Sequence, residues 1–147
     1  MKTFISDYLG VNKELYELIP VKGKDNLPNL RNKLIETTLE GGQNVIIFDA
    51  DSPSKNGGCK YRHDSIMHYL KENAIEADIF LFPNNQDDGD FETLLMNIVQ
   101  RDKHALFFDC YEDYEKCLGG EYEHPNLKGK IFTYVSAQKM SASQRKK

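Results

Sequence analysis

The stretch that decides the fold is VIIFDAD, residues 45–51, in which four consecutive apolar residues lead directly into two aspartates spaced two apart. Such an apolar run is typical of a strand buried in a parallel sheet. Residues two apart on an extended chain point the same way, so we expect Asp49 and Asp51 to present both carboxylates at the carboxyl end of the strand, where open α/β sheets bind ligands. Two hard oxygen ligands favour Mg²⁺ or Mn²⁺. The pattern therefore predicts a metal site for phosphate chemistry.

The composition indicates a globular chain of one domain. Of the 147 residues, 39% are hydrophobic and 29% are charged, and there is no apolar run long enough to span a membrane. The start of the chain, MKTFISD, lacks the continuous apolar stretch of a secretory leader. We therefore expect a cytoplasmic location and no membrane partner.

Neither the cysteines nor the net charge indicates a function. Three cysteines without a repeating spacing predict reduced thiols. A zinc site from Cys110, Cys117, His104 and His124 is an alternative, but the sequence has no close C-x₂₋₄-C pair. The net charge of −4 gives no general attraction to nucleic acid, so a polyanion would need a local basic patch or a bound cation.

The elements around the central stretch alternate between helix and strand. Before it, we expect a helix ending near Leu9, a strand over residues 15–21 and a helix over residues 27–39 that stops at Gly41-Gly42. After it, we expect a mobile loop over residues 52–59 that suits a lid. A helix capped by Asp64 and a parallel strand over residues 77–82 follow. The alternation predicts an α/β three-layer sandwich with a mainly parallel central sheet.

An acidic loop over residues 83–90 opens the next expected helix. Acidic side chains such as Asp90 and Glu92 are favoured at a helix start, so one interpretation is a solvated N-terminus. The loop also follows the strand beside the Asp-x-Asp strand, so its acids are expected at the same edge of the sheet. Glu92 is the preferred third acidic residue, as a metal ligand and catalytic group.

A further amphipathic helix is expected over residues 105–118, and its aromatic residues allow two interpretations. They stack on bases, or they form core or an interface. The second is favoured, because the acids between them, Asp109, Glu112, Asp113 and Glu115, repel a nucleic acid backbone. We expect one domain over residues 1–140 and a disordered basic tail over residues 141–147.

The order of several motifs resembles a small bacterial TOPRIM-related family of uncharacterised proteins, similar to the TOPRIM domain of OLD-type nucleases. The motifs are Lys22-Gly23, Gly41-Gly42, Val45–Asp51, Phe80–Asn85 with Gly89, and Phe91–Leu95. The resemblance covers most of residues 1–100. It implies a TOPRIM-like (Rossmann-like) fold in which Asp49 and Asp51 hold Mg²⁺, as in topoisomerases, primases and nucleases.

The sequence departs from this family at its start. TOPRIM domains begin with a strand that ends in a glutamate, usually followed by glycine, and this glutamate is the general acid or base. No such strand is recognised here, and residues 3–9 look like the helix that follows it, so the first strand is expected to be missing. Without the proton-transfer group, catalysis loses a contribution of roughly 10²–10⁴ in rate.

The favoured function is that of a Mg²⁺-dependent nuclease acting on phosphodiester bonds of DNA or RNA. Asp49 and Asp51, with Glu92, hold the cation against a phosphate. The turn Lys22-Gly23-Lys24 is the expected substrate-binding segment, in which either lysine neutralises a non-bridging oxygen; the alternative for each is an ordinary surface cation.

Two other functions are kept open. One is a catalytically silent module that binds nucleotide or protein. The other is a phosphatase of the haloacid dehalogenase type with Asp49 as nucleophile and Asp51 as second acid, although that family places its Asp-x-Asp strand first. OLD-type proteins also couple this domain to an ATPase, and since the chain has no G-x-x-x-x-G-K-[ST] loop, such an ATPase would be a separate chain.

Overall fold

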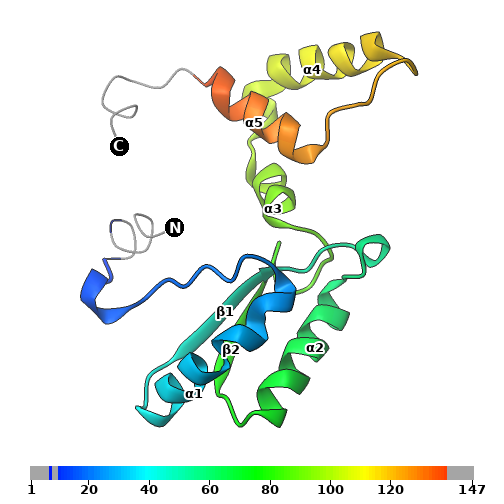
Figure 1. Ribbon diagram of the computed structural model, residues 1–147. Helices are drawn as coiled ribbons and strands as arrows, with labels where there is room; N and C mark the ends of the chain where they lie inside the picture. The colour runs from blue at the N-terminus through cyan, green and yellow to red at the C-terminus, as the bar shows by residue number, and fades with distance from the viewer. Residues whose placement is uncertain (1–6, 8–9, 139–147) are drawn as a thin grey trace.

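The computed structural model describes residue 7 and residues 10–138, and it is a mixed α/β structure with a small parallel sheet (Figure 1). Its two strands are β1, Asn44–Asp49, and β2, Ala77–Phe82. The strands pair in parallel, with Asn44 opposite Ala77 and Asp49 opposite Phe82. The sequence prediction of both strands and of their parallel direction is therefore confirmed.

Helix α2, Cys59–Glu72, connects the two strands and completes a βαβ unit. The prediction that Asp64 caps this helix was wrong, since the helix begins at Cys59. The reason is a cap from elsewhere in the chain: the backbone N–H of Cys59 donates to the carboxylate of Asp88 at 2.7 Å. Gly58, with φ of 109°, provides the turn into the helix.

Directly before β1, the chain forms a 3₁₀ helix that continues into an α-helix. A 3₁₀ helix, η3, Lys24–Leu30, continues into α1, Arg31–Leu39, and Gly41 with φ of 73° ends it, as predicted. The strand expected over residues 15–21 was wrong: a short 3₁₀ turn, η2, Lys13–Leu15, is followed by chain without strand pairing. Pro20 has no N–H to donate to a ladder, which disfavours pairing there.

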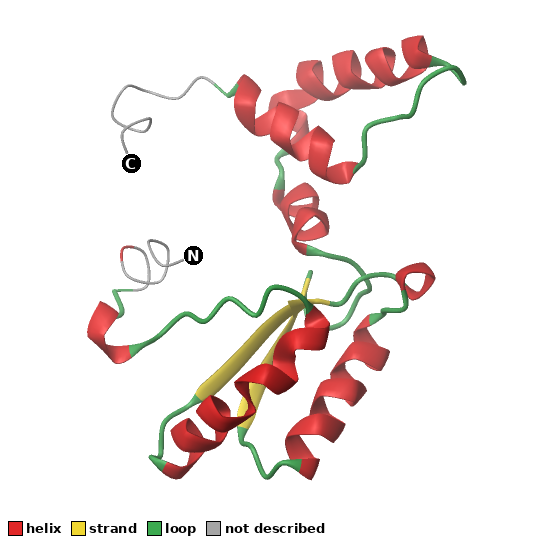
Figure 2. Ribbon diagram, viewed as in Figure 1, coloured by secondary structure: helices red, strands yellow, loops and turns green. Residues whose placement is uncertain are grey.

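The core lies on one face of the sheet. Ile46 and Ala50 on the β1 side and Leu81 on β2 point to this face, because residues two apart share a side. Leu34 and Ile35 of α1 pack against the same cluster. The cluster also contains Leu27 of η3 and the buried apolar residues of α2 and its C-terminal flank, namely Cys59, Ile66, Leu70 and Ile75. In Figure 2, α1 crosses in front of the two strands.

The opposite face of the sheet is open among the described residues. Val45 is 57% exposed and Ile47 is 38% exposed, and both alternate with the buried positions of β1. A three-layer sandwich with helices on both faces is therefore not confirmed for the part of the chain that the structure describes.

Three further helices follow the sheet: α3, Phe91–Ile98; α4, Ala105–Leu118; and α5, Leu127–Ala137. A 3₁₀ turn, η5, Arg101–His104, links α3 to α4. The bounds of α4 agree with the prediction for residues 105–118. Figure 1 shows α4 and α5 side by side, and α3 contacts α5 and β2.

The aromatic residues of α4 form a second core. Phe108 and Tyr111 are buried, and the ring of Phe108 stacks on Tyr134 of α5 at 5.5 Å. Phe107 also contacts Tyr134, at 5.3 Å. The interpretation as core is therefore confirmed for Phe108 and Tyr111, whereas Tyr114 is 49% exposed.

Two expectations lie outside the described residues: the helix near residues 3–9, of which only Asp7 is described, and the tail over residues 141–147. Within the described part of the chain, no helix has both the length and the apolar character needed to cross a membrane.

Candidate functional site

The carboxyl ends of the two strands bring Asp49, Asp51 and the start of α3 together. Asp49 is the last residue of β1, and one of its carboxylate oxygens accepts a hydrogen bond from the backbone N–H of Phe91 at 3.0 Å. Asp90 precedes it as the N-cap of α3, where its side chain accepts from the N–H of Thr93 at 2.9 Å and completes a capping box. The expected helix start at the acidic loop is therefore present.

The electrostatic environment of Asp49 is unfavourable to its negative charge. Burial raises the pKa of the Asp49 carboxyl above its ordinary value, although the Phe91 N–H acts in the opposite direction. The charges of three more carboxylates, Asp51, Asp90 and Glu92, raise this pKa further. Burial and the neighbouring carboxylates thus both disfavour the charged form of Asp49.

Asp51 contacts a buried cation. Its Oδ2 lies 3.1 Å from Nη2 of Arg62, whose side chain is only 7% exposed, whereas the side chain of Asp51 is 32% exposed. The backbone of Asp51 also forms an isolated antiparallel bridge with Gly89. Asp49 and Asp51 thus have different partners, although they are two residues apart.

Glu92 is also paired. Its Oε1 lies 3.7 Å from Nζ of Lys128 on α5, and its side chain is 22% exposed. The structure therefore brings Glu92 near Asp49, as expected, and adds a cation from the C-terminal helices that the sequence analysis did not find.

The predicted substrate-binding turn lies before η3. Gly23, with φ of 116°, is the N-cap of η3, and the carbonyl of Lys22 accepts from Nδ2 of Asn26 at 2.8 Å. Lys24 extends to the loop that follows Asp51, since its Nζ lies 3.5 Å from the carbonyl oxygen of Asn56. Lys24 is thereby placed beside the loop that follows Asp51.

The loop expected to act as a lid is folded on itself. It contains a short 3₁₀ turn, η4, Pro53–Lys55. The N–H of Gly57 donates to the carbonyl of Ser52 at 3.0 Å, and that of Gly58 donates to the carbonyl of Ala50 at 2.8 Å. These bonds tie the loop to the end of β1 rather than leaving it free over the site.

No known protein-family model, curated protein or solved structure matches this sequence.

The donor set fits a divalent cation in part. Mg²⁺ is usually bound by one or two carboxylates, with water and phosphate oxygens completing its coordination. Asp49 and Asp51 supply such carboxylates, and Glu92 is engaged by Lys128. Among the described residues, no three His, Cys, Asp or Glu side chains form a group that could hold a metal. A cation here would thus depend on the Asp pair and on ligands from outside the chain.

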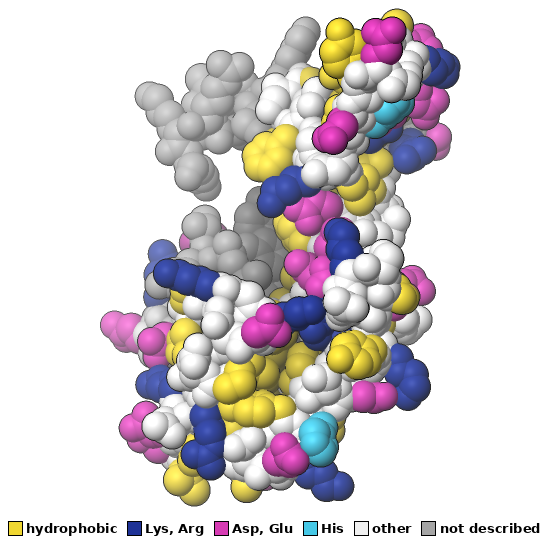
Figure 3. Space-filling view, turned by 45° about the vertical axis from the view of Figure 1, so that its right-hand side comes forward, with side chains coloured by type: hydrophobic (Ala, Val, Ile, Leu, Met, Phe, Trp, Pro, Cys, Tyr) yellow, Lys and Arg dark blue, Asp and Glu magenta, His cyan; other side chains and the backbone are white. Residues whose placement is uncertain are grey.

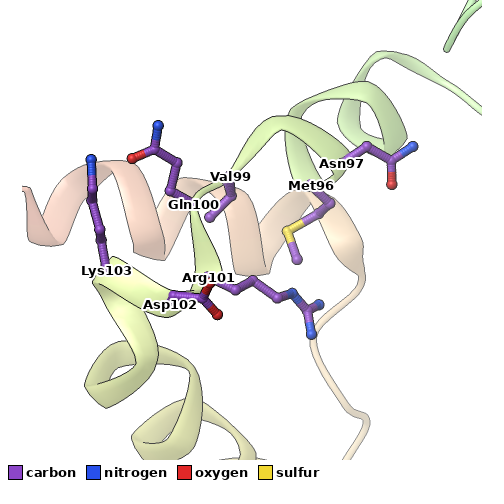
Figure 4. Close-up of a pocket in the computed structure, with 7 residues that line it drawn as sticks. All are labelled: Met96, Asn97, Val99, Gln100, Arg101, Asp102 and Lys103. Carbon is purple, nitrogen blue, oxygen red and sulfur yellow. The ribbon is translucent and has the colours of Figure 1, made fainter.

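A cavity elsewhere in the molecule does not have the character of a ligand site. It measures about 700 Å³ and lies at the junction of α3 and η5, between residues 96 and 103. Figure 4 shows that the polar ends of its side chains diverge: Gln100 and Lys103 point to one side, and Arg101 points to another. Ligand pockets place a few polar groups so that they converge.

The surface charges also fail to form a basic patch on the face drawn in Figure 3. Lys and Arg side chains, in dark blue, are interspersed with Asp and Glu side chains, in magenta, among the residues drawn in colour. Any nucleic acid bound on this face would therefore need local cations rather than a broad positive field.

Two site residues were missed from the sequence, Arg62 and Lys128. A signal for Arg62 exists, because it shares the buried face of α2 with Cys59, Ile66 and Leu70. A charged residue on an apolar stripe needs a buried partner. Lys128 gives no comparable signal, because its position beside Glu92 depends on how α5 packs against α3.

Proposed function

We propose that this chain is a Mg²⁺- or Mn²⁺-dependent TOPRIM-like domain that acts on phosphodiester bonds of nucleic acid through the strand ends at Asp49 and Asp51. The observation that carries the proposal is the position of Asp49 at the carboxyl end of β1, beside the start of α3, where burial and then the charges of Asp51, Asp90 and Glu92 raise the pKa of its carboxyl. Buried or crowded carboxylates that lack a cation in the protein are suited to bind one from solution.

Each residue at the strand ends has a separate role in the proposed reaction. Asp49 and Asp51 hold the cation, which when bound would stabilise negative charge that develops on a phosphoryl group. Lys24, which lies beside the loop after Asp51, binds a non-bridging phosphate oxygen. Glu92 remains paired with Lys128 and keeps the start of α3 beside Asp49.

The proposed TOPRIM-like fold has one layer more than the structure describes. A TOPRIM-like three-layer sandwich has helices on both faces of its sheet, and here Val45 and Ile47 leave one face exposed. The mixed α/β architecture, with a βαβ unit that ends in the Asp-x-Asp pair, supports the proposal without fixing the third layer.

The first experiment is a calorimetric titration of Mn²⁺ into the wild type and into Asp49→Asn/Asp51→Asn. The matched control is Asp64→Asn/Asp113→Asn, which changes the charge by the same amount at exposed sites on α2 and α4. We expect binding in the wild type and the control and none in the site variant. Equal binding in the site variant, or none in the wild type, would refute the proposed centre.

The second step is an activity assay with Mn²⁺ on supercoiled plasmid DNA and on labelled single-stranded RNA. Strand cleavage that is lost in Asp49→Asn supports the nuclease and identifies its substrate. Phosphate release from a phosphomonoester, without strand cleavage, would instead favour the phosphatase of the haloacid dehalogenase type.

One observation favours the catalytically silent module as a second candidate. Two of the three acids expected to hold the cation already have a cation of the protein as partner, since Asp51 contacts Arg62 and Glu92 contacts Lys128. Carboxylates that are paired in this way are less available to a metal ion. Binding of DNA or nucleotide without cleavage would support this candidate. Cleavage by the wild type would reject it.

A further inference from the structure

The position of Asp51 is fixed more tightly than that of an ordinary loop residue. Its φ of 59° is in the left-handed region, which non-glycine residues adopt at some cost. Its N–H donates to the carbonyl of Gly89 at 2.7 Å, and its carbonyl accepts from the N–H of Gly89 at 3.0 Å. Gly57 packs so closely that a Cβ there would lie 2.5 Å from Cβ of Asp51. Two neighbours from different loops therefore hold this backbone in place.

Arg62 holds the side chain of Asp51 from the buried side. It lies in the first turn of α2, and its backbone N–H donates to the carbonyl of Gly58 at 2.8 Å. Side chains of a helix lean toward its N-terminus, so the guanidinium is directed toward the end of β1. The side chain is more than nine-tenths buried, and its contact with Oδ2 of Asp51 measures 3.1 Å.

The guanidinium has a donor that the described residues do not use. Its Nε is buried and has no hydrogen-bond partner among them. A buried guanidinium is costly unless it is paired, and a buried donor without an acceptor adds to that cost. Such an arrangement is a poor choice for stability alone, which points to a role for the Arg62–Asp51 contact in the site.

We propose that Arg62 is a positioning residue, which orients the carboxylate of Asp51 so that its second oxygen faces the cation-binding edge. This inference rests on the proposed function and deepens it. Arg62 contacts only Oδ2 of the two carboxylate oxygens, and the side chain of Asp51 is 32% exposed. Groups that orient metal ligands in this way typically contribute 10–100-fold to metal affinity.

The test compares Mn²⁺ affinity among variants of the full chain. Arg62→Met removes the guanidinium and retains an apolar stem, and we expect Mn²⁺ binding to weaken by about 10–100-fold. The control is Lys60→Met, which makes the same charge change on the same helix at a side chain that is 90% exposed, and its affinity should equal that of the wild type. Arg62→Lys keeps the positive charge but lacks the planar guanidinium, so its Mn²⁺ affinity should also fall. This variant replaces Arg62→Met in the test if Arg62→Met does not fold.

A metal-free measurement separates orientation from simple charge. Unfolding free energies of Asp51→Asn, Arg62→Met and the double variant form a cycle, and we expect the double variant to lose less than the sum of the single losses. We also expect the amide protons of Asp51 and Gly89 to exchange faster with solvent in Arg62→Met.

The positioning role of Arg62 and the metal site at Asp49 and Asp51 can fail separately. If the wild type binds Mn²⁺ and Arg62→Met binds it equally well, the positioning role is overturned while the metal centre stands. Additive losses and unchanged amide exchange overturn it as well. If the wild type binds no Mn²⁺, the proposed function fails and the positioning role fails with it.

Discussion

At the scale of single residues, Asp49 is the group whose ionisation should affect stability. Its pKa is raised in the folded state, so the folded protein binds this proton more tightly than the unfolded chain does. The contribution of Asp49 to stability is then fully present below its ordinary pKa of 3.8 and is lost as the pH rises through the folded pKa.

We therefore expect Asp49→Asn to be more stable than the wild type at neutral pH, with a difference that disappears below pH 3.8. The amide oxygen retains an acceptor for the Phe91 N–H, so the change removes mainly the charge. Urea unfolding of both proteins at several pH values measures the effect. A variant that is less stable at neutral pH would show that the negative charge is compensated.

The three thiols should differ in reactivity. Cys59 is buried, and burial followed by the charges of Asp88 and Asp87 raises the pKa of its thiol, whereas Cys110 and Cys117 are exposed. Because the thiolate is the reactive form, a colorimetric disulfide reagent should modify Cys110 and Cys117 first. Cys59 should react only in denaturant. Rapid reaction of all three thiols in the native protein would contradict the packing at the start of α2.

At the scale of secondary-structure elements, the capping box makes the start of α3 sensitive to one residue. Asp90→Ala removes the acceptor for the Thr93 N–H and should destabilise the protein by about 1 kcal/mol. Asp109→Ala, an exposed change within α4, is the control and should have little effect. The midpoint of urea unfolding provides the comparison, and equal midpoints for the two variants would contradict the cap.

Elements defined by local sequence were predicted well. The apolar run of β1, the run over residues 77–82 and the amphipathic pattern over residues 105–118 each contain their own signal. The start of α2 was wrong because its cap, Asp88, comes from a loop 29 residues further along the chain. The expected strand over residues 15–21 failed because alternation alone does not supply a pairing partner.

The same distinction holds at the candidate site. Asp49 and Asp51 follow from the strand that carries them, and the parallel pairing of β1 with β2 places Glu92 near Asp49. The two cations, Arg62 and Lys128, depend on the packing of α2 and α5. Local patterns in the sequence therefore predict the acidic residues of this site, whereas the cations that pair with them are determined by tertiary packing.

At the scale of the whole molecule, stability should depend strongly on the single buried face of the sheet. Leu81 has no exposed surface, so Leu81→Ala should cost about 2–5 kcal/mol through lost burial and a residual cavity. That is a large part of the 5–15 kcal/mol typical of a folded domain. Leu106→Ala, at a side chain that is 78% exposed, should change stability by about 0.5 kcal/mol or less. Thermal unfolding followed by circular dichroism tests both, and a small loss for Leu81→Ala would place the core elsewhere.

The pair between Glu92 and Lys128 has a consequence for communication across the molecule. The carboxylate of Glu92 contributes to the pKa of Asp49, while the ammonium of Lys128 belongs to α5, far along the chain. The start of α3, to which Glu92 belongs, also donates its Phe91 N–H to Asp49. The contact between Lys128 and Glu92 therefore joins the C-terminal helices to the helix start that binds Asp49.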